Sequence, residues 1–434
     1  MKKITVIMMA AILFLVSAAG VNAGTGIQTV LVPEDNVGIE FGRDVAINNQ
    51  TVLVGESSGG TGYIYEFEKD VWVQKAALSM NESSYTHNVA LSDNFAILAS
   101  DDSLHIFEKP VSGWADTNEV TVLIPNDFNP ENNRISDVNI HGNTVVVGTG
   151  VGSLDIGKRQ FYIFEFDGKE WIQTATVSGD AFPKTGFGLH VDVYGDRIIA
   201  SGLSASTTNT FYIFKKDGGG AWYLEAELNT ESSFSIKNVA ITDGYAIAGG
   251  SGDIVYIFRY DNEHWFLSQK ISEKDETGKY GYFGWGVDIN PEYAVIGFPL
   301  YSAKDIPVCG AVFLLKNQDG IYVKTEVYTP ENPQLVGFFG YSLSISDDYF
   351  VAGHINDHLN SRNGSAIVFS LFAPGDLDRD GCVGKNDAAI LRTYLNRPVS
   401  ECPECNLDGK DDKITILDAR TLVKLCTNAN CECP

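Results

Sequence analysis

Residues 238–271 have the sequence NVAITDGYAIAGGSGDIVYIFRYDNEHWFLSQKI, and this stretch decides the fold. Short runs of alternating apolar and polar residues are separated by Thr242-Asp243-Gly244, by two glycines and by Asp261-Asn262. A period of two, broken by Gly, Asp and Asn, predicts short antiparallel strands, about four in this stretch. One such sheet cannot bury both of its faces alone, so we expect neighbouring copies.

The same pattern occurs seven times, and five of the six tryptophans occupy one position in it, after the third strand. Repeats of about 45 to 55 residues with four strands each are typical of propeller blades. The first strands begin at Val45, Val89, Val138, Val191, Val239, Val287 and Leu343. The aromatic position is occupied by Trp72, Trp114, Trp171, Trp222, Trp265 and Tyr322.

The seventh copy ends after its third strand. Residues 28–36, QTVLVPEDN, are similar to residues 324–332, KTEVYTPEN, which end the sixth copy. We therefore expect the N-terminal segment to supply the missing outer strand, so that the ring closes without an open edge. The sequence thus predicts an all-β seven-bladed propeller over residues 24–374, in which the N-terminal strand closes the last blade.

The first 23 residues are predicted to be a secretory signal peptide. Lys2 and Lys3 precede an apolar run, and Val21-Asn22-Ala23 forms a small-residue cleavage site. The run is too short for a membrane span. We expect the mature chain to be secreted or held at the cell surface, without a membrane span. The net charge of the full sequence, −25, argues against nucleic acid as a partner, because nucleic acid requires basic surface.

Four Phe-Gly pairs stand just before first strands, at residues 41–42, 187–188, 283–284 and 339–340. The phenylalanines are expected to pack between blades, and the glycines to let the backbone approach closely. These pairs resemble the FG-GAP repeats of integrin-alpha-like propellers. Many blades of that family carry a calcium loop, but none of the seven copies here has its acidic motif. Metal binding is therefore not expected on the ring.

The repeats contain no nucleophile elbow, zinc-binding helix motif or phosphate-binding glycine loop. A pair of carboxylates acting as in a glycosidase stays open, because acidic residues are abundant. Two longer connections, residues 148–159 and 299–307, are the most favourable places for a binding loop.

Six of the seven cysteines lie near the C-terminus, whereas the repeats contain only Cys309. In an exported chain this concentration favours disulfides within a small module, and the sequence does not choose among the 15 pairings. Zinc binding by Cys402, Cys405, Cys431 and Cys433 is the alternative. The disulfide candidates are Cys382, Cys402, Cys405, Cys426, Cys431 and Cys433.

Residues 376–387, DLDRDGCVGKND, have the layout of an EF-hand calcium loop. Asp376, Asp378 and Asp380 supply carboxylates at positions 1, 3 and 5, and the glycine at position 6 allows the sharp turn. The carbonyl of Cys382 supplies position 7, and Asp387 supplies position 12 at the start of a predicted helix. The first calcium site is therefore expected to be strong.

A second, degenerate copy is expected to bind calcium more weakly. Its position 6 holds Asp412 instead of glycine, and its spacing requires one inserted residue near Gly409 or Lys410. The oxygen ligands that calcium prefers are still present. The ligand candidates are Asn406, Asp408, Asp411, the carbonyl of Lys413 and Asp418.

Two loop–helix units in tandem, each ending its loop in Asp, resemble a type I dockerin over residues 375–426. The resemblance implies two calcium ions and a cohesin-like partner protein. It further implies that Lys385 and Asn386 in one copy, and Ile416 and Leu417 in the other, help to bind that partner. Here these pairs are not the Ser/Thr pairs of cellulosomal members. We therefore assign residues 375–434 to a small α-helical dockerin-like domain with two EF-hand-type loops.

The leading functional hypothesis is an exported, non-catalytic protein whose propeller is an interaction platform and whose tail docks on a partner with calcium. A polysaccharide or a cell-surface ligand is the candidate partner of the propeller. One alternative is a glycoside hydrolase or polysaccharide lyase that bears a dockerin. The other is a calcium-dependent adhesin.

Overall fold

The computed structural model describes most of the ring and part of the C-terminal segment. The described residues are 28–34, 40–57, 59–68, 71–80, 86, 88–118, 121–151, 159–182, 186–202, 209–231, 234–303, 306–331, 337–355, 364–372, 375–378, 382–402, 405–407 and 413–426. The signal peptide predicted at residues 1–23 lies outside them. No helix among the described residues is long and apolar enough to cross a membrane.

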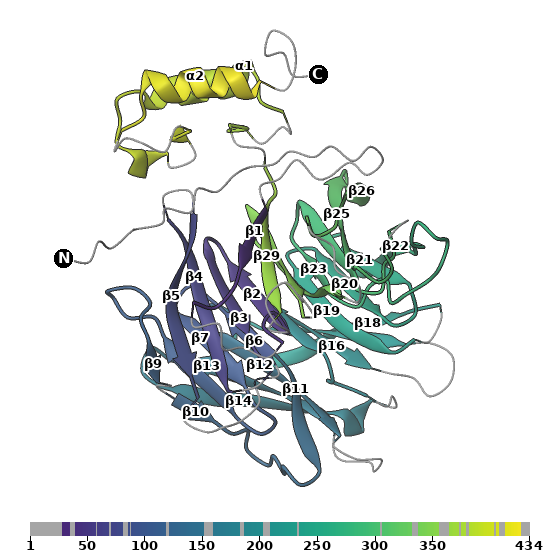
Figure 1. The fold of residues 1–434 in the computed structure, drawn as a ribbon. Coiled ribbons are helices and arrows are strands. Elements are labelled where there is room, and N and C mark those ends of the chain that lie inside the picture. The colour runs from purple at the N-terminus through teal and green to yellow at the C-terminus, as the bar shows by residue number, and fades with distance from the viewer. Residues whose placement is uncertain are drawn as a thin grey trace, which may run out of the picture.

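Seven antiparallel sheets are arranged as the blades of a ring, which confirms the predicted propeller (Figure 1). The first strands of successive blades contact one another, and the strand of the seventh blade contacts that of the first. These seven strands therefore form the inner wall of the ring. In the first six blades the later strands follow outward in chain order, and in the seventh blade the N-terminal strand β1 (Gln28–Leu31) takes the outermost place.

The first three blades have the following strands. The first contains β2 (Asp44–Asn48), β3 (Thr51–Gly55), β4 (Thr61–Glu68) and β5 (Val71–Ser79). The second contains β6 (Asn88–Leu91), β7 (Phe95–Ala99), β8 (Leu104–Glu108) and β10 (Thr121–Leu123). The third contains β11 (Asn133–His141), β12 (Thr144–Val151), β13 (Gln160–Phe166) and β14 (Trp171–Ser178), followed by the short 3-10 helix η1 (Gly179–Ala181).

The remaining blades repeat the pattern. The fourth contains β15 (Val191–Tyr194), β16 (Arg197–Gly202), β17 (Thr210–Lys216) and β18 (Trp222–Asn229). The fifth contains β19 (Ile236–Thr242), β20 (Tyr245–Gly250), β21 (Val255–Tyr260) and β22 (Trp265–Ile271). The sixth contains β23 (Val287–Ile289), β24 (Tyr293–Phe298), β25 (Ala311–Gln318) and β26 (Ile321–Tyr328). The seventh contains β27 (Phe339–Ile345), β28 (Tyr349–His354), β29 (Ser365–Ser370) and β1 (Gln28–Leu31).

The N-terminal strand β1 supplies the outer strand of the seventh blade. It pairs antiparallel with β29, so that Gln28 lies opposite Phe369 and Leu31 opposite Ala366. The two ends of the propeller sequence are thus held in one sheet, and β29 gains a hydrogen-bonded neighbour on its outer side.

The second blade departs from the repeat at its aromatic position. Trp114 precedes the outer strand β10 instead of opening it, because an inserted segment contains β9 (Thr117–Asn118). β9 pairs in parallel with β5 of the first blade, where Leu78 lies opposite Thr117. Trp114 is nevertheless buried and packs in a cluster with Leu78 and Phe107 from the two blades.

The aromatic residue of the outer strand packs against the preceding blade. The ring centroids of Trp72 and Tyr349 are 5.3 Å apart, and those of Tyr322 and Tyr245 are 5.2 Å apart, both in edge-to-face geometry. Such pairs stabilise by about 1 kcal/mol beyond the area that they bury. The repeated aromatic position is therefore explained by packing between blades.

The Phe-Gly pairs have the packing role predicted for them. All four phenylalanines are fully buried, and their glycines have φ angles from 67° to 93° that favour glycine. The carbonyl oxygen of each pair's glycine lies against a glycine in the second strand of the preceding blade, where a Cβ would collide with it. The contacting pairs are Gly148 with Gly188, Gly249 with Gly284, Gly297 with Gly340, and Gly353 with Gly42.

Side chains from one inner strand accept hydrogen bonds from the backbone of the next. The donors are backbone N–H groups of the next inner strand. They lie on its edge that faces the centre of the ring, where no other strand pairs with it. Four aspartates and one serine are the acceptors. The bonds run from Val89 to Asp44 (2.7 Å), Val191 to Asp137 (3.0 Å), Ile241 to Asp192 (2.7 Å), Ile345 to Asp288 (2.8 Å) and Ile47 to Ser344 (3.2 Å).

Burial between closely packed strands shifts the protonation equilibrium of these four aspartates towards the neutral form. Burial raises the pKa of Asp44 and of Asp137 to about 7 and that of Asp288 to about 6. Burial, together with the charge of Asp288, also raises the pKa of Asp192 well above its ordinary value. Other charged groups face them. Arg43 lowers the pKa of Asp44, whereas the charge of Asp44 raises that of Asp137.

His190 also faces this group, with its Nδ1 3.8 Å from Asp137 Oδ2. Burial, together with the charge of Lys237, lowers the pKa of His190 to about 4. The imidazole is therefore neutral at pH 7 and does not compensate the charge of Asp137.

The first prediction concerns the pH dependence of stability. The pKa values of Asp44, Asp137 and Asp288 in the folded protein lie above the value for an unfolded chain. Their contribution to the free energy of unfolding is therefore complete below about pH 4, where they are protonated, and is lost as the pH rises through 6 and 7. A one-unit change in pKa corresponds to about 1.4 kcal/mol. In calcium buffer, we expect the Tm of the ring in calorimetry to fall between pH 5 and pH 8.

Asn keeps the acceptor oxygen but carries no charge. The double variant Asp44→Asn/Asp137→Asn should therefore gain stability at pH 8 and show a flatter Tm profile than the unmodified chain. Asp243→Asn, at an exposed turn, is the control and should leave the profile unchanged. An equally steep profile in the double variant would contradict the assignment.

The second prediction concerns the glycine contact at the seam of the ring. In Gly353→Ala the new Cβ would collide with the carbonyl oxygen of Gly42, so blades seven and one would have to separate. Overpacking of this kind should lower the free energy of unfolding by about 3 kcal/mol, measured by urea denaturation. Gly218→Ala is the control, because no atom lies within 4 Å of its added Cβ, and its stability should stay within about 1 kcal/mol.

Candidate metal site

After the ring, the chain forms two helices that pack on each other, α1 (Lys385–Tyr394) and α2 (Ile416–Leu425) (Figure 1). A short 3-10 helix, η3 (Val399–Glu401), lies between them in sequence. Their shared core contains Val383, Leu391, Cys402, Cys405, Ile414 and Leu422. Pro398 and Lys413 form an antiparallel bridge, which holds the segments before and after η3 together.

Three of the predicted ligands lie together at the start of α1. One carboxylate oxygen each from Asp376, Asp378 and Asp387 lies within 4.8 Å of the others. Asp387 is fully buried and Asp376 is 6% exposed. Three carboxylates in so small a space repel one another unless a cation lies between them, and carboxylate oxygens are the ligands that calcium prefers. The chemistry of this donor set fits a hard divalent cation.

Asp387 also orders the loop itself. Its Oδ1 accepts hydrogen bonds from the backbone N–H groups of Leu377 (2.6 Å) and Asp378 (3.1 Å), and its Oδ2 accepts one from Gly384 (2.6 Å). A carboxylate offers about four lone-pair sites, so an acceptor site remains. Asp387 therefore ties both ends of the loop to the first turn of α1.

The other predicted ligands of the first loop are only partly described. Cys382, whose carbonyl was assigned to position 7, is buried. Asp380, assigned to position 5, lies outside the described residues.

The second loop repeats part of this arrangement. Asp418 is fully buried, and its Oδ2 accepts a hydrogen bond from the backbone N–H of Thr415 (2.7 Å). The Oδ1 of Asn406, at position 1, is buried and accepts no hydrogen bond from the residues that the structure describes. A cation ligated there would satisfy this oxygen. Lys413 is exposed, whereas Asp408 and Asp411 lie outside the described residues.

Thr415 caps α2 and was not among the predicted site residues. Its side chain accepts a hydrogen bond from the backbone N–H of Leu417 at 3.1 Å. The signal was present, because Thr415 and Asp418 form the spacing of a capping box before an apolar run.

The four residues that the dockerin resemblance assigns to partner binding lie on the first turns of the two helices. Lys385 and Asn386 are exposed at the start of α1. Ile416 is 60% exposed and Leu417 44% exposed at the start of α2. Val423, which is also 60% exposed, lies seven residues after Ile416 and thus on the same face of α2.

The cysteine cluster forms disulfides where it is described. Cys402 and Cys405 are bonded to each other, which excludes them as zinc thiolates and confirms a disulfide at this pair. Cys382 and Cys426 are disulfide-bonded as well. Cys431 and Cys433 lie outside the described residues. Cys309 is a free, buried thiol in the sixth blade.

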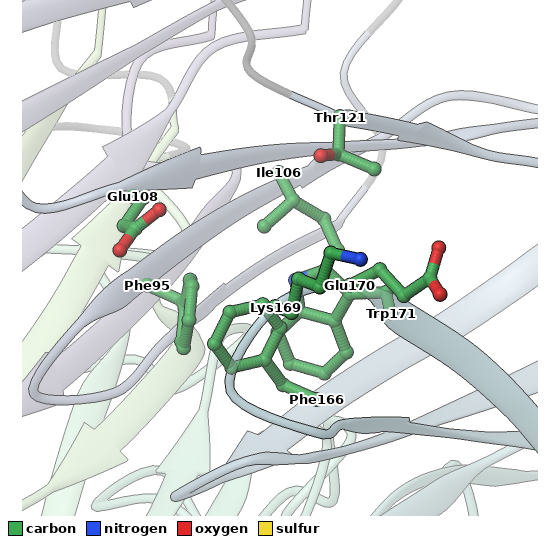
Figure 2. A pocket seen from close by; sticks show the side chains of 8 residues that line it. All are labelled: Phe95, Ile106, Glu108, Thr121, Phe166, Lys169, Glu170 and Trp171. Atoms are coloured by element: carbon green, nitrogen blue, oxygen red, sulfur yellow. The ribbon is translucent and has the colours of Figure 1, made fainter.

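The ring has a hollow between its second and third blades (Figure 2). Aromatic packing forms its floor, where the ring centroid of Phe95 lies 5.0 Å from that of Trp171 and 5.1 Å from that of Phe166. The charged residues at its edge include Lys169 and Glu170, which belong to the turn between β13 and β14. Thr121 of β10 and Trp171 of β14 both line it, so the hollow lies between residues of the second and third blades.

No family model matches the sequence, and no curated protein sequence matches it. Among solved structures, the chain is similar to one described as "Structure of Dos1 propeller", with a TM-score of 0.47 and 12% identity. That match covers 74% of this chain and 75% of the other. The propeller assignment comes from the strand order of the seven sheets themselves.

Proposed function

We propose that this chain is an exported binding protein, in which the propeller is an interaction platform and the C-terminal segment attaches it to a partner with calcium. The observation that supports this proposal best is the cluster of Asp376, Asp378 and Asp387 at the start of α1. These residues are positions 1, 3 and 12 of the expected loop. Their proximity is what a folded calcium loop requires.

Calcium would serve as a structural ion in both loops. In the first, Asp376, Asp378, Asp387 and the carbonyl of Cys382 would hold it, with Asp380 as a further ligand. In the second, Asn406 and Asp418 would hold it, with Asp408, Asp411 and the carbonyl of Lys413. The ion would neutralise the carboxylates that crowd the start of each helix and so favour the folded form of the module.

The exposed side of the helices supports a docking role. Ile416, Leu417 and Val423 present apolar surface on α2, in a module whose core is already filled by other residues. Exposed apolar side chains on a helix are suited to a partner protein. With the resemblance to type I dockerins, this favours a cohesin-like partner, contacted by the first turns of both helices.

A calcium titration of the mature full-length chain tests the proposal. We expect calorimetry to detect two ions, bound tightly in the first loop and more weakly in the second. A ligand present at 100 times its Kd stabilises the folded form by about 2.7 kcal/mol, so calcium should raise the Tm of the module.

The informative variant is Asp376→Asn/Asp378→Asn, because it removes two charges but spares Asp387, which orders the loop through hydrogen bonds. This variant should lose the tight site and keep the weak one. The control Asp243→Asn on the ring should bind as the unmodified chain does. Unchanged tight calcium binding in the double variant would contradict the assignment of the tight site to the first loop.

A further inference from the structure

The residue two positions before the first-strand Val or Leu occupies an equivalent place in every blade. In four consecutive blades, the fifth, sixth, seventh and first, this residue is Lys237, Trp285, Tyr341 and Arg43. The inner strands of these blades are neighbours, in the order β19, β23, β27 and β2. In the other three blades the position holds His87, which lies outside the described residues, Ser136 and Leu189.

The four side chains contact one another from blade to blade. Lys237 Nζ lies 4.7 Å from the ring centroid of Trp285, whose ring lies 5.6 Å from that of Tyr341. Arg43 Cζ lies 5.9 Å from the Tyr341 ring. Tyr282 adds a third aromatic ring, whose centroid lies 5.0 Å from that of Trp285, and its side chain is 40% exposed. We name these five residues the cation–aromatic arc.

Tyr282 is held in an unfavourable backbone conformation. Its φ is 67°, a left-handed value that carries a free-energy penalty for any residue other than glycine. The residue before the Phe-Gly pair has a similar φ in all four blades that carry the pair, and in the fourth blade it is Gly186, with φ 68°. Glycine fits this position without strain, yet the sixth blade has an exposed tyrosine there. Glu40 and Phe338 occupy the same position in the first and seventh blades, with φ of 54° and 53°, so the backbone conformation belongs to the repeat and the exposed tyrosine is what distinguishes the sixth blade.

The arc lies on the opposite face of the ring from the attachment of the C-terminal segment. His354 is paired with Phe339 at the start of β27 and with Ser365 at the start of β29. Both strands therefore begin on the face that carries the arc. β29 ends at Ser370 on the other face, and the chain continues from there towards α1.

Charge on the arc is opposite to that of the chain as a whole. The net charge of the protein is −25, whereas the arc brings two cations beside three aromatic rings. Arg43 pairs with Glu40 at 2.8 Å, but Lys237 has no carboxylate within 4 Å among the described residues. Charge complementarity therefore favours an anionic ligand.

We propose that the arc binds a polysaccharide built of uronic acids. A sugar ring has an apolar C–H face that packs on aromatic rings and a polar edge that needs hydrogen bonds and charge partners. Trp285, Tyr341 and Tyr282 form the stacking surface. Arg43 and Lys237 pair with the carboxylates along the chain. This inference rests on the proposed function, because it names the ligand class of the binding platform.

Affinity electrophoresis and calorimetry of the mature full-length chain with soluble polygalacturonate test it. We expect binding that weakens with salt and persists in chelator, because the arc needs no metal. Neutral dextran should not bind. Trp285→Ala should weaken binding about 10-fold or more, as expected for a central aromatic contact. Lys237→Gln should weaken it about 3-fold and reduce its dependence on salt.

The control is Tyr223→Ala, which removes a tyrosine that is 48% exposed on the outer strand β18 of the fourth blade. It should bind as the unmodified chain does. The Tm of every variant shows whether it is folded, and the exposed side chain of Tyr282 gives a second variant, Tyr282→Ala, with little effect on packing. Unchanged affinity in Lys237→Gln and Tyr282→Ala would overturn the proposal, as would equal retention of the unmodified chain by dextran.

Failure of this inference can be told apart from failure of the proposed function. Asp376→Asn/Asp378→Asn alters calcium binding in the C-terminal loops and should leave polygalacturonate affinity unchanged. Affinity lost in that variant, or in chelator, would place the polysaccharide on the C-terminal loops and overturn the arc. Absence of any polyuronate binding overturns the arc while leaving the calcium titration unaffected.

Discussion

The structure depends on how the inner strand of each blade satisfies its second edge. One edge pairs with the next strand of the same sheet, but the other faces the centre of the ring and pairs with no strand. A backbone N–H that is removed from water without an acceptor is costly. Among the residues that the structure describes, a side chain on the preceding blade accepts from such an edge at five junctions. Adjacent blades must therefore lie close enough for a carboxylate or hydroxyl to reach across.

Glycine contacts provide that closeness. Where Gly353 faces Gly42, or Gly297 faces Gly340, the two backbones meet with no side chain between them. This close packing desolvates the carboxylates. Water is removed from Asp44 and Asp137, which raises the pKa of each. The same proximity that lets these groups accept hydrogen bonds thus disfavours their charged form. A serine, as at Ser344, performs the task without that conflict.

The sequence predicted those parts of the fold that are local and repeated. Alternation with a period of two predicted the strands, the recurrent tryptophan predicted the repetition of the blades, and the Phe-Gly pairs predicted packing between blades, because each feature lies within one repeat. β9 was not foreseeable, since its short parallel pairing with β5 has no periodic signal. The inner aspartates were missed for another reason. Asp44 and Asp137 precede the first-strand valine, whereas Asp192 and Asp288 follow it, so no single repeat position is acidic throughout.

In the candidate metal site, too, the local sequence pattern was predictable and the contacts that depend on folding were not. Asp376, Asp378 and Asp387 belong to one loop of fixed spacing, and a local loop is readily predicted from its sequence. Their hydrogen bonds could not be read in that way, because the three backbone donors to Asp387 depend on how the loop closes. Trp285 is instructive in another respect. It is the one tryptophan outside the repeated position, and packing between blades alone does not explain why it lies where it does.

Strand direction links the two proposed sites. All seven inner strands begin on one face of the ring, and each third strand ends on the other. A segment that follows the third strand of the last blade, as the C-terminal segment does, therefore leaves the ring on the face opposite to the one where the inner strands begin. This holds whatever the fold of that segment. Because β1 completes that blade from the N-terminus, the chain is free to leave the ring after its third strand. A partner held by the C-terminal helices would therefore leave the arc open to a second ligand, and closure of the ring by β1 is what makes this separation possible.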